Sequence, residues 1–209
     1  KNHDKMLDES AIRSFDGSFI SKSKMDAFVK QQMDSLQMPG LSMAFINDNK
    51  IIYNKVFGVK NIETQEKADA TTLFDAASMS KTVFSFFVMK MVDQGLLDLD
   101  TTLYKYMEYP DIALSIKFQP GTQFLYSGEG FKFLALVIAH LKGVTKNDLQ
   151  ALIKKEVFDP LDMGHSSYVW NDHIEKHRAK GHFQGKLNSG YAINADNPNF
   201  IAAGSLQTD

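Results

Sequence analysis

The chain has 209 residues, of which 44% are hydrophobic and 23% are charged, proportions typical of a folded globular protein with one domain, or a domain and a subdomain. A formal net charge of −2 gives no electrostatic reason to expect a nucleic-acid partner. No run approaches the ~18 apolar residues of a membrane-spanning helix. The absence of cysteine excludes disulfides, thiol catalysis and thiolate metal sites.

The first part of the chain predicts an arm followed by a helix. Residues 1–20 are polar and without a clear pattern, so we expect a loosely held arm before the domain formed by residues 21–209. Ser21 or Ser23 is expected to cap the helix. Its apolar residues recur at helical spacing and are Met25, Phe28, Val29, Met33 and Leu36.

A β-hairpin is predicted next. Residues 41–46 and 51–59 are rich in strand-forming side chains, and the turn-forming residues 47–50 separate them. We therefore expect these two segments to form adjacent antiparallel strands.

The stretch Ala76–Lys81 and the run Thr82–Gln94 are the most informative part of the sequence. Apolar residues occur on every side of that run, which predicts a helix buried all round that ends at Gly95. Ser78 and Lys81 are three residues apart, so both side chains would project from one face of the first turn. Burial would disfavour the ammonium form of the lysine, which could then take a proton from the serine hydroxyl.

Ser-x-x-Lys is a weak pattern by itself, and the chain contains a second copy at Ser21–Lys24. A purely structural interpretation makes Ser78 or Ser80 an N-cap and lets Lys81 extend to water. The surroundings separate the two copies, because the first opens an ordinary amphipathic helix and the second opens the apolar one.

Two further helices are predicted in the second half of the chain. A strongly apolar run over residues 131–142 is ended by Gly143. Thr145–Asp148 resembles a capping box with Asp in place of Glu or Gln, and we expect it to open an amphipathic helix that continues to Val157.

Four stretches resemble the serine β-lactamase and penicillin-binding-protein superfamily, in particular its class C β-lactamase, DD-peptidase and family VIII esterase branch. Pro39–Gly58 is similar to the opening hairpin, Phe74–Lys81 to the nucleophile motif, Pro120–Gly128 to the segment bearing Tyr-x-Asn, and Val157–Gly164 to a helix-ending Pro-Leu-Gly-Met stretch. The resemblance implies an α/β (α+β) fold, in which helices flank an antiparallel sheet and a mostly helical subdomain adjoins it.

The resemblance also implies a serine hydrolase that acts through an acyl-enzyme on an ester, a β-lactam or a D-amino-acid peptide carbonyl. Ser78 would be the nucleophile, Lys81 its deprotonating partner, and Tyr126 a second proton-transfer group stabilised as phenolate by lysine charge. Without nearby cations a phenol, with a pKa of about 10, is useless as a base at neutral pH. Alone, Tyr126 would be interpreted as a packing aromatic.

The partners implied are a small-molecule or peptide substrate, with no cofactor, no metal, no nucleic acid and no membrane span. Members of the family imply a periplasmic or extracellular bacterial location. The oligomeric state is left open.

The chain departs from the family pattern at three places. Gly128 stands where Asn is usual, so a substrate amide that this Asn would bind loses its partner. The family's Leu-Leu-x-His-Thr-Ser-Gly stretch is missing between Met107 and Pro120, and no Lys-Thr-Gly or His-x-Gly triplet occurs in the 209 residues. These departures favour a second possible function, that of a non-catalytic protein of the same fold that binds peptide or cell-wall fragments.

Two short motifs point to different kinds of site. Gly128-Glu129-Gly130 before a helix resembles part of a phosphate-binding loop, but Phe133 stands where a third glycine is expected. His173 and His177, with His182 nearby, are spaced for a metal on one helical face, although no acidic third ligand is evident.

Only two clear strands are predicted, whereas a stable sheet usually needs three or more with one face covered. We therefore expect further strands to come from residues outside this sequence, and the family fold to be incomplete at the C-terminal side.

Overall fold

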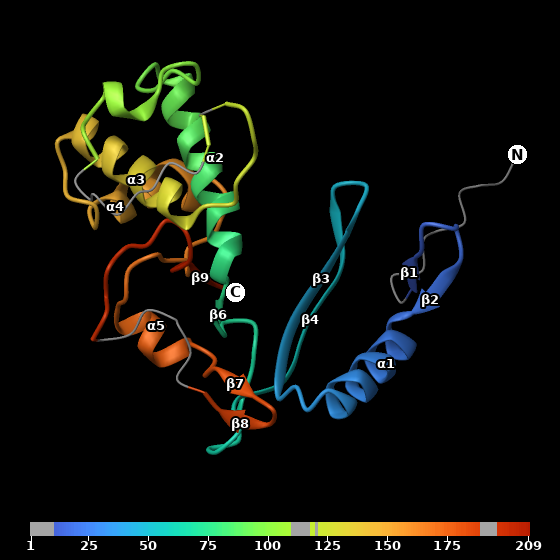
Figure 1. The fold of residues 1–209 in the computed structure, drawn as a ribbon. Helices are drawn as coiled ribbons and strands as arrows, with labels where there is room; N and C mark the ends of the chain where they lie inside the picture. Colours follow the sequence, from blue (N-terminus) through green and yellow to red (C-terminus); the bar gives the residue numbers. More distant parts are fainter. Residues whose placement is uncertain (1–10, 110–117, 120, 189–195) are drawn as a thin grey trace, which may run out of the picture. The chain divides into compact units, whose positions relative to one another are not determined.

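The computed structural model describes residues 11–109, 118–119, 121–188 and 196–209, and it divides by contacts into two compact units (Figure 1). The first unit contains residues 1–72, 179–190 and 209, and the second contains residues 73–178 and 191–208. The single-domain assignment of residues 21–209 stays a prediction.

The first unit begins with a small hairpin and a helix. Strands β1 (Ala11–Arg13) and β2 (Phe19–Ser21) pair antiparallel, and helix α1 (Lys22–Ser35) follows directly. Ser21 caps this helix, because its Oγ accepts the backbone N–H of Lys24 at 3.2 Å. Ile12 is buried in the core of this unit, while the expectation of a loosely held arm over residues 1–20 stays a prediction. Strands of three residues are too short to show the alternation by which a strand is recognised.

The predicted hairpin is confirmed. Strands β3 (Gly40–Asn47) and β4 (Lys50–Asn61) pair antiparallel, and the short β5 (Glu66–Lys67) adds to the other edge of β4. The turn between the long strands places Asp48 and Asn49 at φ 49° and 58°. Two successive residues at positive φ match the twist of paired strands, which is why turn-forming residues stand there.

A close backbone approach at Gly58 fixes the start of this hairpin. The glycine has φ +76°, and a Cβ atom placed on it would lie 1.9 Å from the carbonyl oxygen of Pro39. The next residue, Val59, donates its N–H to that same carbonyl at 2.8 Å. No side chain fits at position 58 without moving the strand.

Helix α1 is fastened to β4 by polar contacts around Asp26. The Tyr53 hydroxyl donates to one carboxylate oxygen at 2.7 Å, and Lys55 pairs with the other. These hydrogen bonds, from Lys55 first and Tyr53 second, lower the pKa of Asp26, whereas burial raises the pKa of Tyr53 to about 12. The main hydrophobic cluster of the first unit consists of Ile12, Val29, Met33, Tyr53 and Phe57.

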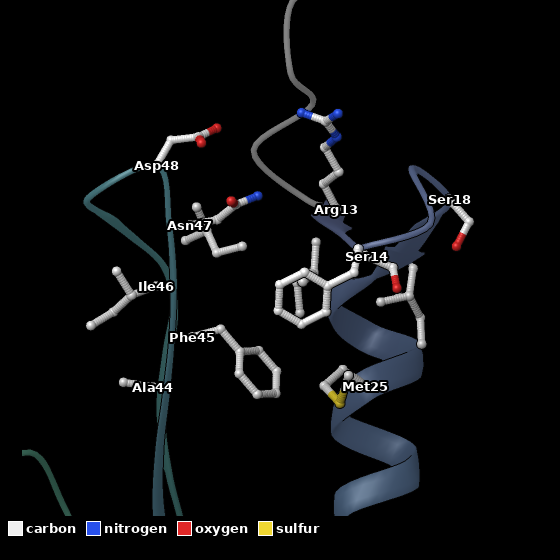
Figure 2. A pocket seen from close by; sticks show the side chains of 13 residues that line it. Arg13, Ser14, Ser18, Met25, Ala44, Phe45, Ile46, Asn47 and Asp48 are labelled. Atoms are coloured by element: carbon white, nitrogen blue, oxygen red, sulfur yellow. The ribbon is translucent and has the colours of Figure 1, made fainter.

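A largely apolar groove of about 630 Å³ lies within the first unit, between the β1–β2 hairpin, α1 and the tip of the β3–β4 hairpin. Figure 2 shows Met25 of α1 and Phe45 of β3 pointing toward one another across it. Arg13 and Asp48 lie among its polar lining residues.

The second unit is mostly helical. Its helices are α2 (Ser80–Asp93), α3 (Gly128–Lys142), α4 (Leu149–Ile153) and α5 (Asp172–His177), with shorter turns η1 (Ala77–Met79), η2 (Leu103–Lys105) and the π-helical η3 (Lys154–Phe158). Strands β6 (Phe74–Asp75) and β9 (Gln207–Thr208) pair antiparallel. The largest fully buried side chains form an aromatic core of Phe84, Phe87, Phe158, Tyr168 and Phe200.

Helix ends follow the sequence signals closely. Gly95 and Gly143, predicted stops, have φ +72° and +66°. Thr145 and Asp148 form the expected reciprocal box, since the Asp148 carboxylate accepts the N–H of Thr145 at 2.8 Å and the Thr145 hydroxyl accepts that of Asp148 at 3.4 Å. Helix α3 starts three residues before the expected position 131, because Ser127 caps it through the N–H of Gly130 at 3.0 Å.

The prediction that α2 is buried on all sides is wrong. Phe84, Phe87 and Met91 are buried in the core, whereas Phe86 and Met89 are 47% and 49% exposed. One face packs on the aromatic core of the second unit and the other does not, although both are apolar in sequence.

The predicted fold class is confirmed. The described residues form antiparallel sheets and helices, with the long hairpin in the first unit and most of the helices in the second. In the part of the chain that the structure describes, no helix is long and apolar enough to cross a membrane.

Candidate active site

Ser78 lies in the turn η1 between strand β6 and helix α2. The turn is closed by the Asp75 carboxylate, which accepts the N–H of Ala77 at 2.9 Å, and by the carbonyl of Ala76, which accepts the N–H of Met79 at 2.9 Å. Ala77 has φ +42°, a left-handed conformation that is unusual for a residue with a Cβ. Such strain is often held at functional positions, and here it directly precedes the exposed Ser78.

Lys81, in the first turn of α2, contacts Ser78 directly. Its Nζ donates to Ser78 Oγ at 3.1 Å and to the backbone carbonyl of Ala203 at 2.7 Å. The side chain is half-buried. The bond to the Ala203 carbonyl holds the amine beside the serine hydroxyl, which is the geometry of a base next to a nucleophile.

Tyr126 lies against the same amine. Its ring centroid is 4.7 Å from Lys81 Nζ, close enough for a cation–π contact. Hydrogen bonding with the side chain of Lys81, and to a smaller extent with that of Ser78, lowers the pKa of the Tyr126 hydroxyl below its ordinary value. The structure therefore brings together Ser78 and Lys81 from one segment and Tyr126 from another, with the phenolate form of Tyr126 favoured by its neighbours.

The fourth candidate, Gly128, is the first residue of α3. A Cβ atom at this position would lie 3.6 Å from the Cβ of Ala203, an ordinary contact. The backbone therefore does not require glycine here. An alanine at this position would contact Ala203, the residue whose carbonyl binds Lys81.

Ala203 is a part of the site that sequence reasoning missed. It lies in the segment 201–206, which the sequence shows only as a short apolar run ending near the last residue. The small residues Ala202, Ala203 and Gly204 are the one available signal, since they allow a backbone carbonyl to approach a lysine closely.

A histidine metal site is not supported by the geometry. The rings of His165, His173 and His177 stack with centroids 5.1 Å and 4.2 Å apart, so their nitrogens do not converge. Among the described residues, no group of three or more His, Cys, Asp or Glu could hold a metal ion. His182 lies in the first unit, where its Nε2 accepts the N–H of Ile62 at 3.2 Å and burial lowers its pKa.

The remaining short motifs also have structural roles. Gly130 is inside the first turn of α3, and its N–H is bound by the cap Ser127 rather than presented to a phosphate. Ser21, in the second Ser-x-x-Lys copy, caps α1. Most of the segment between Met107 and Pro120, where the family's Leu-Leu-x-His-Thr-Ser-Gly stretch is missing, falls outside the described residues.

Comparison with known proteins finds similar sequences and similar solved structures. The chain is 22% identical over 208 residues to protein flp of Staphylococcus aureus (strain MRSA252), covering 78% of this chain and 41% of that protein. Two solved structures share the fold: a class C beta-lactamase (TM-score 0.73, 20% identity, 90% of this chain and 61% of the other) and the octameric penicillin-binding protein homologue from Pyrococcus abyssi (TM-score 0.70, 21% identity, 90% and 53%).

The chain thus spans less than two thirds of the length of each of these relatives. A family model described as Beta-lactamase matches residues 25–116 and 112–204, which include Ser78, Lys81, Tyr126 and Ala203. The chain belongs to the beta-lactamase family.

Proposed function

We propose that this chain carries the acyl-transfer site of a serine hydrolase. Ser78 Oγ attacks a substrate carbonyl while its proton passes to Lys81 and from Lys81 to the phenolate of Tyr126, which delivers it to the leaving group as the carbonyl–leaving-group bond breaks. Water then attacks the Ser78 ester, releasing the acid and returning the proton to the serine. The supporting observation is that Lys81 Nζ contacts both other residues. It lies 3.1 Å from Ser78 Oγ and 4.7 Å from the Tyr126 ring centroid.

The substrate we propose is an ester, a β-lactam or a D-amino-acid peptide, met in the periplasm or outside the cell. The likeness to a class C beta-lactamase supports a β-lactam. Gly128 supports an ester, because an ester carries no amide that would need a side-chain partner at this position. The reactive centre is a carbonyl in every case, so the same three residues would act.

A non-catalytic protein that binds peptide or cell-wall fragments is the second candidate. One observation favours it, namely Gly128 in the position where the family has Asn. Such a protein would bind a penicillin without forming a bond to Ser78, which separates the two functions experimentally.

The test is covalent labelling of the chain with a fluorophosphonate and with a fluorescent penicillin, followed by mass-spectrometric mapping of the modified residue. We expect the label on Ser78 and none on Ser78→Ala. Ser21→Ala is the matched control, since it breaks the other Ser-x-x-Lys copy and costs about 1 kcal/mol as a lost helix cap, but keeps the label. Labelling that persists in Ser78→Ala, or no labelling of the wild-type chain, contradicts the proposal.

A further inference from the structure

Three buried hydroxyl groups that take no part in the proposed chemistry lie directly behind the site. They belong to Ser80, Tyr168 and Ser205, each no more than 1% exposed. A buried hydroxyl must be hydrogen-bonded to avoid a desolvation penalty, so its partners show what it holds in place. All three bind backbone groups of the nucleophile turn, of helix α2 or of the segment that supplies Ala203.

Ser80 joins the turn before the nucleophile to the end of the chain segment 201–206. Its Oγ donates to the carbonyl of Ala77 at 2.5 Å and accepts the N–H of Leu206 at 3.0 Å. The N–H of Ala76 donates in turn to the carbonyl of Leu206 at 2.9 Å. The left-handed conformation of Ala77 is therefore held from inside the core.

Tyr168 binds the first turn of α2 at its backbone. Its hydroxyl donates to the carbonyl of Ser80 at 2.5 Å. The Ser80 carbonyl opens helix α2, so this bond fixes the start of the helix from the core. Burial raises the pKa of Tyr168, which keeps it protonated as a donor.

The backbone of Tyr168 also supports the other side of the site. Its carbonyl accepts the hydroxyl of Ser205 at 2.7 Å, and the same Ser205 Oγ accepts the N–H of Ile201 at 2.9 Å. These bonds close the turn from Ile201 to Ser205. Ala203 lies within this turn, and its carbonyl is the one that binds Lys81 at 2.7 Å.

We infer that Tyr168 is a positioning residue for Lys81, an inference that rests on the proposed acyl-transfer function. Its hydroxyl fixes the helical turn from which Lys81 projects, and its carbonyl fixes, through Ser205, the turn whose Ala203 carbonyl holds the lysine amine. Tyr168 thereby positions both the backbone of Lys81 and the carbonyl that binds its amine, although it contacts neither the amine nor the substrate. Loss of the Tyr168 hydroxyl would let the amine drift from Ser78 and Tyr126.

The variant Tyr168→Phe removes only the hydroxyl and keeps the ring, which packs against Phe158 and Phe200 with centroids 6.2 Å and 4.9 Å away. The readout is the rate of Ser78 labelling by a fluorophosphonate as a function of pH, normalised to folded protein. We expect labelling at neutral pH to slow by about tenfold or more, because small displacements of catalytic groups are costly. We expect the rate to recover at higher pH, since a looser Lys81 lets the pKa of Tyr126 rise.

The matched control is Tyr53→Phe, which removes another buried, hydrogen-bonded hydroxyl, in the first unit. It should lower stability but leave the pH profile of labelling unchanged. A merely structural role of Tyr168 would reduce the rate by the same factor at every pH. A wild-type profile in Tyr168→Phe overturns the inference.

A second measurement separates this inference from the proposed function. NMR titration of the Tyr126 side-chain carbon bound to oxygen reports its pKa whether or not the protein turns over a substrate. We expect a higher pKa in Tyr168→Phe, and also in Ser205→Ala, which breaks the same link at its other end and serves if the first variant does not fold. If wild-type Ser78 is not labelled while these pKa values rise, the proposed function fails and the positioning role stands; an unchanged Tyr126 pKa in both variants refutes the positioning role.

Discussion

The pKa of Tyr126 is lowered by hydrogen bonding with Lys81, and removal of its hydroxyl gives the clearest test of proton transfer. Tyr126→Phe keeps the aromatic face over Lys81 but loses the hydroxyl. Turnover of an ester or β-lactam substrate should fall by about 10²–10⁴-fold, the usual range for lost acid–base assistance, with labelling still directed to Ser78. The measurement is kcat/KM beside that of Tyr104→Phe, another exposed tyrosine, as control. Wild-type turnover in Tyr126→Phe would leave Lys81 as the sole proton carrier.

At the scale of residues, local relations could be predicted from the sequence and distant ones could not. Ser78 and Lys81 are three residues apart, so helical spacing alone puts them on one turn. Tyr126 is indicated by a family resemblance and not by spacing. The contacts of Lys81 with Ala203 and of Tyr168 with Ser80 join residues 122 and 88 positions apart, and no local pattern encodes such pairs.

At the scale of elements, two glycines at positive φ should respond very differently to alanine. Gly143→Ala meets no atom within 4 Å and should cost only about 1–2 kcal/mol for the left-handed backbone. Gly58→Ala adds a clash of 1.9 Å with the Pro39 carbonyl, so we expect a loss of about 4 kcal/mol or more. Urea unfolding of the two variants measures the difference, and similar losses would show that the β3–β4 hairpin can shift to accommodate a side chain.

The contact between α1 and β4 should make the first unit sensitive to acid. Because Lys55 and Tyr53 lower the pKa of Asp26 in the folded state, their stabilisation is complete above the carboxyl's unfolded pKa and is lost as the pH falls through its folded pKa. Asp26→Asn should therefore lower stability at neutral pH and flatten the acid limb of a stability–pH curve measured by urea unfolding. Lys55→Met, which leaves the Tyr53 hydrogen bond, should give an intermediate slope. A wild-type slope in Asp26→Asn would assign the acid sensitivity to other carboxyl groups.

Elements with strong end signals could be predicted well. Caps at Ser21 and stops at Gly95 and Gly143 are local hydrogen-bonding choices, and they appear where the sequence places them. The burial of α2 could not be predicted, because Phe86 and Phe87 are chemically identical and only tertiary packing exposes one of them. The β1–β2 hairpin could not be predicted for a related reason, since its stability depends on the burial of Ile12 rather than on any pattern.

At the scale of the whole molecule, each unit has its own core, and the two cores should differ in their effect on the site. Phe200→Ala removes a fully buried ring 6.0 Å from that of Phe84 and should cost about 3–5 kcal/mol. Phe57→Ala creates a cavity in the core of the first unit and should lower the free energy of unfolding by a similar amount. We expect only Phe200→Ala to raise the pKa of Tyr126 in an NMR titration, because Phe200 packs against Tyr168. An equal rise in both variants would mean that the site depends on both cores.

The family could be predicted because four short motifs occur in the family's order along the chain. The division into two units could not be predicted, because the first unit is discontinuous in sequence. It includes residues 179–190, which follow most of the second unit along the chain. Sequence periodicity describes residues that are close along the chain, and it does not indicate that a distant segment packs into an earlier unit.

The pairing of Asp75 with Gln207, and of Lys81 with Ala203, has a consequence for biosynthesis. On the ribosome, the nucleophile turn emerges well before the segment that holds it, 122 residues ahead in the case of Lys81 and Ala203. At ordinary elongation rates this interval is roughly 6–25 s. During that time the segment that binds Lys81 has not been made, so we expect Ser78 to stay unreactive until almost all of these 209 residues have been synthesised.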